Sequence, residues 1–186
     1  GSGTKEGETL IFDFGPPSLY SLTNSFIADF ETGDLRKEAW TRELTDGSQS
    51  WYPPYKYEQN YYGGSSTEYS ILFRLAEQYL IRAEAAMQLG NLQEARNDLN
   101  VIRLRAGLEP TAAGTQEEVR EELQNQWRYE FFTEQGQRWF NLKRTGSANE
   151  ILAPIKPGWK ATDVLFPLPA NELILNPNLN PQNPGY

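Results

Sequence analysis

The chain has 186 residues, a formal net charge of -8 at pH 7, and neither cysteine nor histidine. A negative field of this size repels nucleic acid and anionic lipid surfaces, and no run of lysine or arginine offsets it. The missing thiol and imidazole groups exclude disulfides, thiolate nucleophiles, histidine general bases and zinc sites built from these ligands.

Residues 1–3 (GSG) contain no initiator methionine and no signal-peptide core. We interpret them as a cloning scar, and we expect any targeting sequence or lipid anchor of the parent protein to lie outside this chain. No stretch of the sequence approaches the ~20 apolar residues that a membrane-spanning helix needs.

Residues 4–68 are predicted to form a loop-rich aromatic lobe. Pairs such as Pro16-Pro17 and Gly63-Gly64 punctuate this segment, so only short elements are expected, near residues 24–30 and 35–44. Six aromatic residues lie within twelve positions: Trp51, Tyr52, Tyr55, Tyr57, Tyr61 and Tyr62. Because segments that stay unfolded are poor in aromatic residues, we expect the lobe to pack onto something.

A helical core is predicted over residues 69–145. Apolar residues recur at three- and four-residue spacing from Leu72 to a stop at Gly90, and again from Leu92 to a stop at Gly107. The turn between the two helices is so short that it predicts an antiparallel hairpin.

The hairpin has the small-residue spacing of a tetratricopeptide unit, with Ala83, Gly90 and Ala95 at the positions where two helices approach closely. One such unit cannot bury its own apolar faces. We therefore expect either a longer repeat array, of which this hairpin is the last member, or cover from the rest of this chain.

Thr115 and Glu118 form a predicted capping box for a third helix, which is expected to end near Gly136. A short fourth helix is predicted over residues 139–143. Helical spacing assigns Trp127, Trp139 and Phe140 to the core. Seven prolines make residues 146–186 an irregular tail without sustained helix, with a short extended piece at residues 164–166.

The lobe also has the composition of a sugar-binding surface, because sugars stack their C–H faces on aromatic rings and pair their hydroxyls with polar side chains. The candidate ligand-binding residues are Trp51, Tyr52, Tyr55, Gln59, Asn60, Tyr61 and Tyr62. The alternative is that these rings pack the lobe onto the helices, and Tyr57 is assigned to that role. Trp40 and Trp159 have no assignment, although either is a candidate exposed ring.

Several charged residues offer a weaker catalytic interpretation: Arg82, Glu84, Arg103, Glu130 and Arg138. Charged groups on packed helices are more often ion pairs, and the sequence does not define the carboxylate separation that glycoside hydrolysis needs. The acidic run at residues 117–122 suits a helix start better than calcium, and no phosphate-binding loop is present. We therefore expect no enzyme activity, no cofactor and no metal.

Several blocks of sequence resemble the C-terminal region of SusD/RagB proteins, and they occur in the same order as in that family. Residues 79–85 (YLIRAEA) and 99–108 (LNVIRLRAGL) resemble its last helical hairpin. Residues 130–146 (EFFTEQGQRWFNLKRTG) resemble its Glu-Gly-His-Arg-Trp-Phe-Asp-Leu segment. Further matches are residues 33–36 (GDLR), 56–57 (KY), 166–169 (FPLP), 172–173 (EL), 176–179 (NPNL) and 183–186 (NPGY).

The resemblance implies a mainly α fold, with a tetratricopeptide-like hairpin, further helices, the aromatic lobe and the proline-rich tail. It implies a non-catalytic, lipid-anchored protein on the extracellular face of the outer membrane, which binds oligosaccharide and delivers it to a TonB-dependent SusC-like transporter. Gln126-Trp127 and Asn141 depart from the family pattern and put local salt bridges in doubt.

Two other functions remain open. One is a tetratricopeptide-like module that binds a peptide or protein, and some members of the resembled family capture peptides. The other is a glycosidase.

Overall fold

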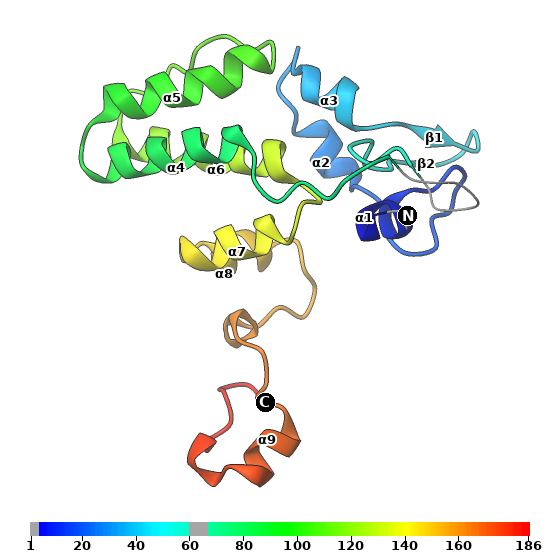
Figure 1. Cartoon of the computed structure of the whole chain (residues 1–186), viewed down its shortest axis with the longest axis vertical. Helices are drawn as coiled ribbons and strands as arrows, with labels where there is room; N and C mark the ends of the chain where they lie inside the picture. The colour runs from blue at the N-terminus through cyan, green and yellow to red at the C-terminus, as the bar shows by residue number, and fades with distance from the viewer. Residues whose placement is uncertain (1–3, 60–66) are drawn as a thin grey trace. The chain divides into compact units, whose positions relative to one another are not determined.

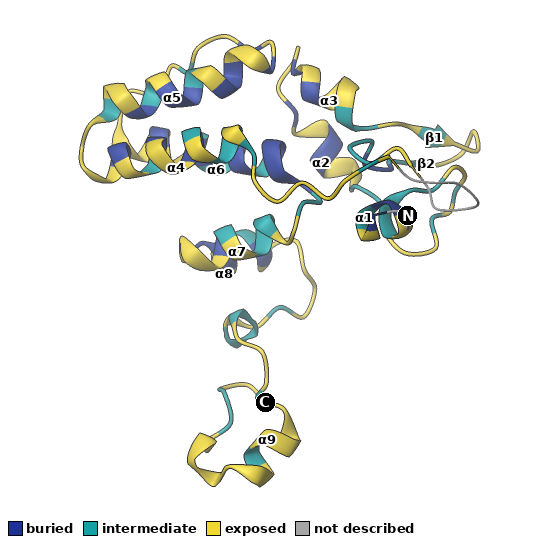
Figure 2. Ribbon diagram, in the orientation of Figure 1, coloured by how far each residue is buried: buried dark blue, intermediate teal, exposed yellow. Residues whose placement is uncertain are grey.

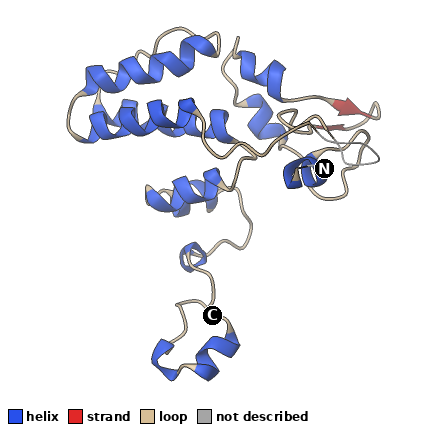
Figure 3. Ribbon diagram, viewed as in Figure 1, coloured by secondary structure: helices blue, strands red, loops and turns tan. Residues whose placement is uncertain are grey.

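The computed structural model describes residues 4–59 and 67–186, and it is mainly helical, as predicted (Figures 1 and 3). Contacts divide the chain into two compact units, Gly1–Phe132 (unit 1) and Thr133–Tyr186 (unit 2). No helix in the described part of the chain has the length and apolar character needed to cross a membrane.

The predicted helical hairpin is confirmed in unit 1 by α4 (Leu75–Gln88) and α5 (Leu92–Arg105), and α6 (Gln116–Phe131) packs against both. Gly90 takes the left-handed conformation (φ +80°) that lets the chain reverse between α4 and α5. The buried positions gather where the three helices meet (Figure 2). This core consists of Leu80, Ala83, Ala86, Met87, Ala95, Leu99, Ile102, Val119, Leu123, Trp127 and Phe131.

Both ends of α6 are set by side chains. The predicted capping box is present, since Glu118 N donates to Thr115 Oγ1 (3.2 Å) and Thr115 N donates to Glu118 Oε2 (2.8 Å). The helix ends at Phe131, earlier than the predicted Gly136. It stops there because Phe132 is extended and Lys56 Nζ binds the Glu130 carbonyl (2.7 Å) in place of a further helical N–H.

The described part of the aromatic lobe contains only short elements, as expected. These are α1 (Lys5–Leu10), α2 (Asn24–Ala28), α3 (Leu35–Trp40), β1 (Leu44–Thr45) and β2 (Ser50–Trp51). The two strands pair antiparallel, with Leu44 opposite Trp51. A second core joins the lobe to the end of α6 through Phe26, Ile27, Phe30, Tyr129 and Phe132.

Unit 2 contains α7 (Gln137–Arg144), α8 (Ala148–Leu152), η1 (Ala161–Val164), α9 (Ala170–Leu175) and η2 (Pro177–Leu179). Its small core is built on Leu142, Ala148 and Leu152. The assignment of Phe140 to the core is wrong, because its side chain is 63 % exposed. A helix turns by about 100° per residue, so Phe140 points away while Trp139 packs against the core of unit 2.

The proline-rich tail is more ordered than predicted. Pro169 stands directly before α9, where its ring does not disturb the helix. Val164 belongs to η1, and the extended conformation begins only at Leu165.

Candidate functional site

The predicted sugar-binding residues lie partly within the described chain. Trp51, Tyr52 and Tyr55 are half-buried, and Gln59 is exposed. Asn60, Tyr61 and Tyr62 lie outside the described residues. The geometry of the candidate site therefore rests on the segment from Trp51 to Gln59.

Trp51 and Tyr52 contact different neighbours, since successive side chains of a strand point to opposite faces. Gly15 packs so closely on Trp51 that a Cβ atom at Gly15 would lie 2.1 Å from Trp51 Cε3. The Tyr52 ring packs against the second core, and its hydroxyl donates to Glu43 Oε1 (3.3 Å). Trp51 therefore keeps an accessible portion in the lobe, while Tyr52 serves mainly to pack it.

Tyr55 and Gln59 are also held in place. Tyr55 N donates to the Trp40 carbonyl (2.7 Å), and the Arg42 guanidinium carbon lies 4.0 Å from the centre of the Tyr55 ring. Gln59 Nε2 donates to Thr67 Oγ1 (3.0 Å), and Gln59 Oε1 accepts from Thr67 N (2.8 Å). The Gln59 amide is thus engaged within the lobe, whereas Tyr55 carries a cation on its ring face.

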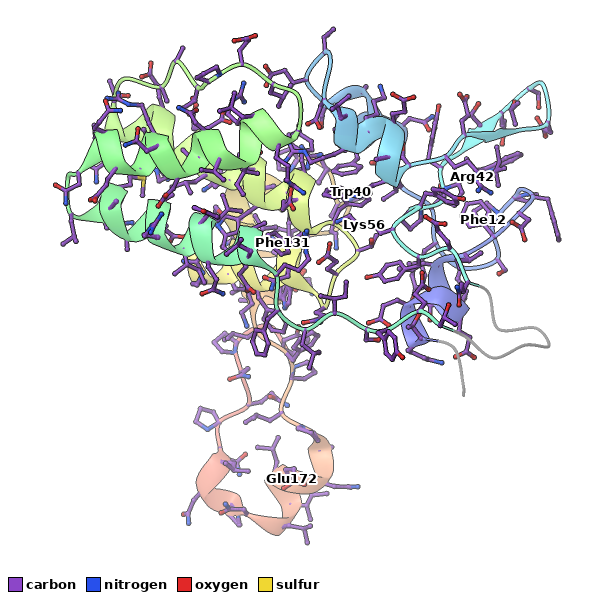
Figure 4. All side chains as sticks on the ribbon, turned by 45° about the horizontal axis from the view of Figure 1, so that its top comes forward. Phe12, Trp40, Arg42, Lys56, Phe131 and Glu172 are labelled. Atoms are coloured by element: carbon purple, nitrogen blue, oxygen red, sulfur yellow. The ribbon has the colours of Figure 1, made fainter. Side chains whose placement is uncertain are left out.

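Trp40 is at the centre of a cationic cluster that the sequence did not predict. The Trp40 ring centre is 4.5 Å from Lys56 Nζ, and 5.7 Å and 5.5 Å from the guanidinium carbons of Arg74 and Arg105. Figure 4 shows the Trp40 and Lys56 side chains directed toward each other. These residues lie far apart in the sequence, so no local pattern could identify the cluster.

Glu130 anchors this cluster. Its carboxylate is fully buried and accepts hydrogen bonds from Arg74 Nη1 (2.7 Å), from Arg36 Nη1 (3.5 Å) and from Arg105. Arg36 is held in turn by Asp34 (Nη2 to Oδ2, 2.7 Å). A buried carboxylate with three guanidinium partners has a clear structural role, because it neutralises cations that tie the lobe to α6.

Two arginines of the weaker catalytic set form separate ion pairs. Arg82 pairs with Asp98 (2.6 Å), and Arg103 pairs with Glu31 (3.0 Å) and Glu122 (2.8 Å). The Asp98 hydrogen bond raises the pKa of Arg82. Burial lowers the pKa of Arg103, but its bonds to the two glutamates outweigh this effect and raise it. The ion-pair interpretation is therefore confirmed for these arginines.

Gln126, at one of the positions that depart from the family pattern, is a neutral side chain that forms hydrogen bonds with two charged side chains. Gln126 Oε1 accepts from Arg36 Nη1 (2.8 Å), and Gln126 Nε2 donates to Glu122 Oε1 (2.8 Å). The side chain is buried, and it bridges the two charge clusters of unit 1.

Three carboxyl groups in the described residues have shifted pKa values, and all three shifts are downward. The hydrogen bond from Arg120 lowers the pKa of Glu117. Backbone N–H groups of Gln49 and Ser48 lower the pKa of Asp46, and those of Thr115 and Gly114 lower the pKa of Glu118. A glycosidase acid needs a raised pKa, so none of the three groups has the property required of one. Within the described residues, no three acidic side chains gather to hold a metal.

Unit 1 also has a groove of about 350 Å³. It lacks the aromatic ring on which a sugar would stack. Its lining consists of Glu31, Arg103, Thr111, Ala112, Ala113, Glu118, Glu121, Glu122 and Asn125.

Comparison with known proteins points to one family. The sequence model of the SusD family matches residues 29–186. The chain is 36% identical over 125 residues to a SusD-like protein, P38, of Formosa agariphila, and 37% identical over 123 residues to the starch-binding protein SusD of Bacteroides thetaiotaomicron. Each match covers 62% of this chain, but 24% and 21% of the respective relative.

A solved structure agrees with the sequence match. The surface glycan-binding protein A of Bacteroides uniformis superimposes with a TM-score of 0.66 and 25% identity, over 88% of this chain and 40% of that protein. The chain thus spans less than half of that structure, and about a quarter or less of the two curated relatives.

Proposed function

Because the chain belongs to the SusD family, we propose that it is a non-catalytic glycan-binding protein that delivers oligosaccharide to a TonB-dependent SusC-like transporter. The observation that carries this proposal is the family match over residues 29–186, which includes most of the aromatic lobe. The starch-binding and glycan-binding relatives support sugar as the ligand class.

The lobe supports sugar binding through rings that are fixed but not fully buried. Trp51 is backed by Gly15, and the backbone of Tyr55 is bonded to Trp40. Rings held in this way lose little conformational entropy when a sugar stacks on them. We propose that Trp51 and Tyr55, with Gln59, Asn60, Tyr61 and Tyr62, contribute to the glycan site, and that Tyr52 supports it from the core side.

Binding without catalysis is supported by the use of charged residues. The buried carboxylate of Glu130 is occupied by three arginines, so it serves the fold rather than proton transfer. We place the protein on the extracellular face of the outer membrane, held there by a lipid anchor and working beside its transporter. In this arrangement the protein captures the ligand and the channel imports it.

The proposal is tested by calorimetry of the whole chain against a panel of neutral and acidic oligosaccharides, including maltoheptaose. At least one glycan is expected to bind. Trp51→Ala and Tyr55→Ala are each expected to weaken binding about tenfold, since a stacked ring contributes about 1 kcal/mol beyond its buried area.

Phe140→Ala serves as the control, because it removes an exposed aromatic ring from unit 2, outside the lobe. Unchanged affinity in both lobe variants would remove these rings from the site. A panel without any binder would reject the glycan function, and a bound peptide in its place would favour the peptide-binding alternative.

A further inference from the structure

Arg42 differs from the other arginines of unit 1 within the described residues. The Arg42 side chain is exposed, and its guanidinium donates no hydrogen bond to an acceptor within the described residues. The others donate to a carboxylate, a side-chain amide or a backbone carbonyl: Arg36, Arg74, Arg82, Arg96, Arg103, Arg105, Arg120 and Arg128. Arg42 is thus a cation whose donors remain available for a ligand.

The backbone positions Arg42 against Tyr55. Arg42 N donates to the Pro53 carbonyl (3.3 Å), and Tyr55 N donates to the Trp40 carbonyl (2.7 Å), so the two segments are bonded side by side. The guanidinium carbon then lies 4.0 Å from the centre of the Tyr55 ring. This distance is well within the range of a cation–π contact, which orients the guanidinium plane before a ligand arrives.

The neighbouring acid does not neutralise Arg42. Glu43 Oε1 accepts from Ser50 Oγ (2.6 Å) and from the Tyr52 hydroxyl (3.3 Å), and it forms no ion pair with Arg42 within the described residues. An uncompensated guanidinium therefore stands beside the half-buried aromatic rings of a chain whose net charge is -8.

A guanidinium fork matches the geometry of a planar carboxylate or of a tetrahedral oxyanion, to which it donates two parallel charge-assisted hydrogen bonds. A neutral sugar hydroxyl gains less from the same group, because its hydrogen bond involves one charge instead of two. The chemistry at Arg42 therefore favours a negatively charged substituent.

We infer that Arg42 and Tyr55 form a subsite for the anionic group of an acidic glycan, either a uronate carboxylate or a sulfate ester. This inference rests on the proposed glycan-binding function and names the class of glycan. In this subsite Arg42 contacts the anion, and Tyr55 orients Arg42 by supporting its guanidinium from the ring face.

The test uses pairs of oligosaccharides that differ only in charge, with the whole chain and calorimetry as the readout. One pair is trigalacturonate and its methyl ester, and the other is a sulfated carrageenan oligosaccharide and its desulfated form. The charged member of at least one pair is expected to bind about tenfold more tightly, and this preference should fall as salt is added. The pair that shows the preference identifies the substituent.

Variants assign the preference to the subsite. Arg42→Gln is expected to reduce the affinity ratio within the pair to about one. Arg42→Lys is expected to retain only part of it, since lysine keeps the charge but loses the planar fork. Lys37→Gln is the matched control, because Lys37 is exposed on α3 in the same lobe and its loss changes the net charge by the same amount. This control should keep the wild-type ratio.

The outcomes separate the inference from the function on which it rests. If charged and neutral members bind equally well, or if Arg42→Gln keeps the wild-type ratio, the subsite is rejected while glycan binding stands. An equal loss in Lys37→Gln would assign the preference to the general field of the lobe and would also reject the subsite. If no member of either pair binds, and the wider panel is silent too, the proposed function itself is rejected.

Discussion

The helical core and the aromatic lobe of unit 1 are ordered by different forces. In α4, α5 and α6, apolar residues at helical spacing meet in one core, and Leu80, Leu99 and Val119 are completely buried. In the lobe the helices have five or six residues and the strands two. The lobe is held by the second core at the end of α6 and by charged side chains that reach α6, of which Arg36 and Lys56 are the clearest examples.

This difference separates a scaffold from the surface that it carries. The helices derive their stability from local periodicity and apolar packing, and they tolerate changes at their exposed positions. The lobe has little local stability, so its attachment depends on contacts with a helix that is distant in sequence. Its candidate rings Trp51 and Tyr55 are held by neighbours within the lobe. A binding surface of this kind can vary in sequence as long as its anchors to the helices remain.

The largest effect is expected where the two regions are joined, in Glu130→Ala. This change leaves three arginines without their buried partner and should lower the free energy of unfolding by about 4 kcal/mol. Urea denaturation followed by tryptophan fluorescence measures this change in the free energy of unfolding. The near-UV circular dichroism signal, to which the packed rings of the lobe contribute, should fall more than the far-UV signal of the helices. Glu121→Ala, at an exposed position of α6, is the control; if it costs as much, Glu130 does not anchor the lobe.

Leu99→Ala probes the scaffold alone. Leu99 is completely buried in the core of α4, α5 and α6, so the cavity should lower the free energy of unfolding by about 3 kcal/mol. Leu104→Ala makes the same chemical change at a position of α5 that is 59 % exposed. Thermal and urea denaturation should show that Leu99→Ala is much less stable than Leu104→Ala. Equal losses of stability in the two variants would contradict an apolar core as the source of stability.

A smaller effect is expected at the start of α6. Thr115→Ala removes the side chain that caps Glu118 N and should destabilise the protein by about 1 kcal/mol. Thr115→Ser keeps the capping oxygen and should restore most of the loss. Chemical denaturation measures the free energy of unfolding of both variants. If Thr115→Ala and Thr115→Ser are equally stable, the cap contributes nothing.

The smallest effect is expected in the turn between β1 and β2, where backbone N–H groups lower the pKa of Asp46 below its ordinary value of 3.8. Since the folded turn favours the ionised form, its contribution to stability is complete above the ordinary pKa and is lost as the pH falls through the lowered one. Titration of the Asp46 carboxyl by NMR should give a midpoint below 3.8. Asp46→Asn should remove the loss of the turn's contribution to stability at acid pH. A midpoint at or above 3.8 would mean that the turn does not hold the carboxylate.

The same contrast explains how much could be predicted from the sequence. The hairpin and the capping box depend on residues within a few positions of one another, so periodicity and spacing were sufficient to predict them. The start of α4 was placed three residues early because Arg74, in the extended segment before the helix, binds the Glu130 carboxylate (2.7 Å). That bond spans 56 residues, and no local pattern contains it.

The candidate site was predicted less completely for the same reason. The composition of the lobe identified Trp51 and Tyr55 as candidate rings, but it could not indicate that Arg42 lies over Tyr55 or that Gly15 backs Trp51. Phe140 shows a limit of local patterns, since helical spacing assigned this residue to the core and the structure leaves it 63 % exposed. Their roles in binding remain predictions for the experiments above.

The link between Arg36 and Glu130 also orders the events of biosynthesis. The two residues are separated by 94 positions, and a chain leaves the ribosome from its N-terminus. The aromatic lobe therefore emerges well before the carboxylate that fixes it, and its closure must wait until α6 has been translated. During that interval its tryptophans and tyrosines are available to chaperones, so the demand on chaperones falls between the translation of the lobe and the translation of α6.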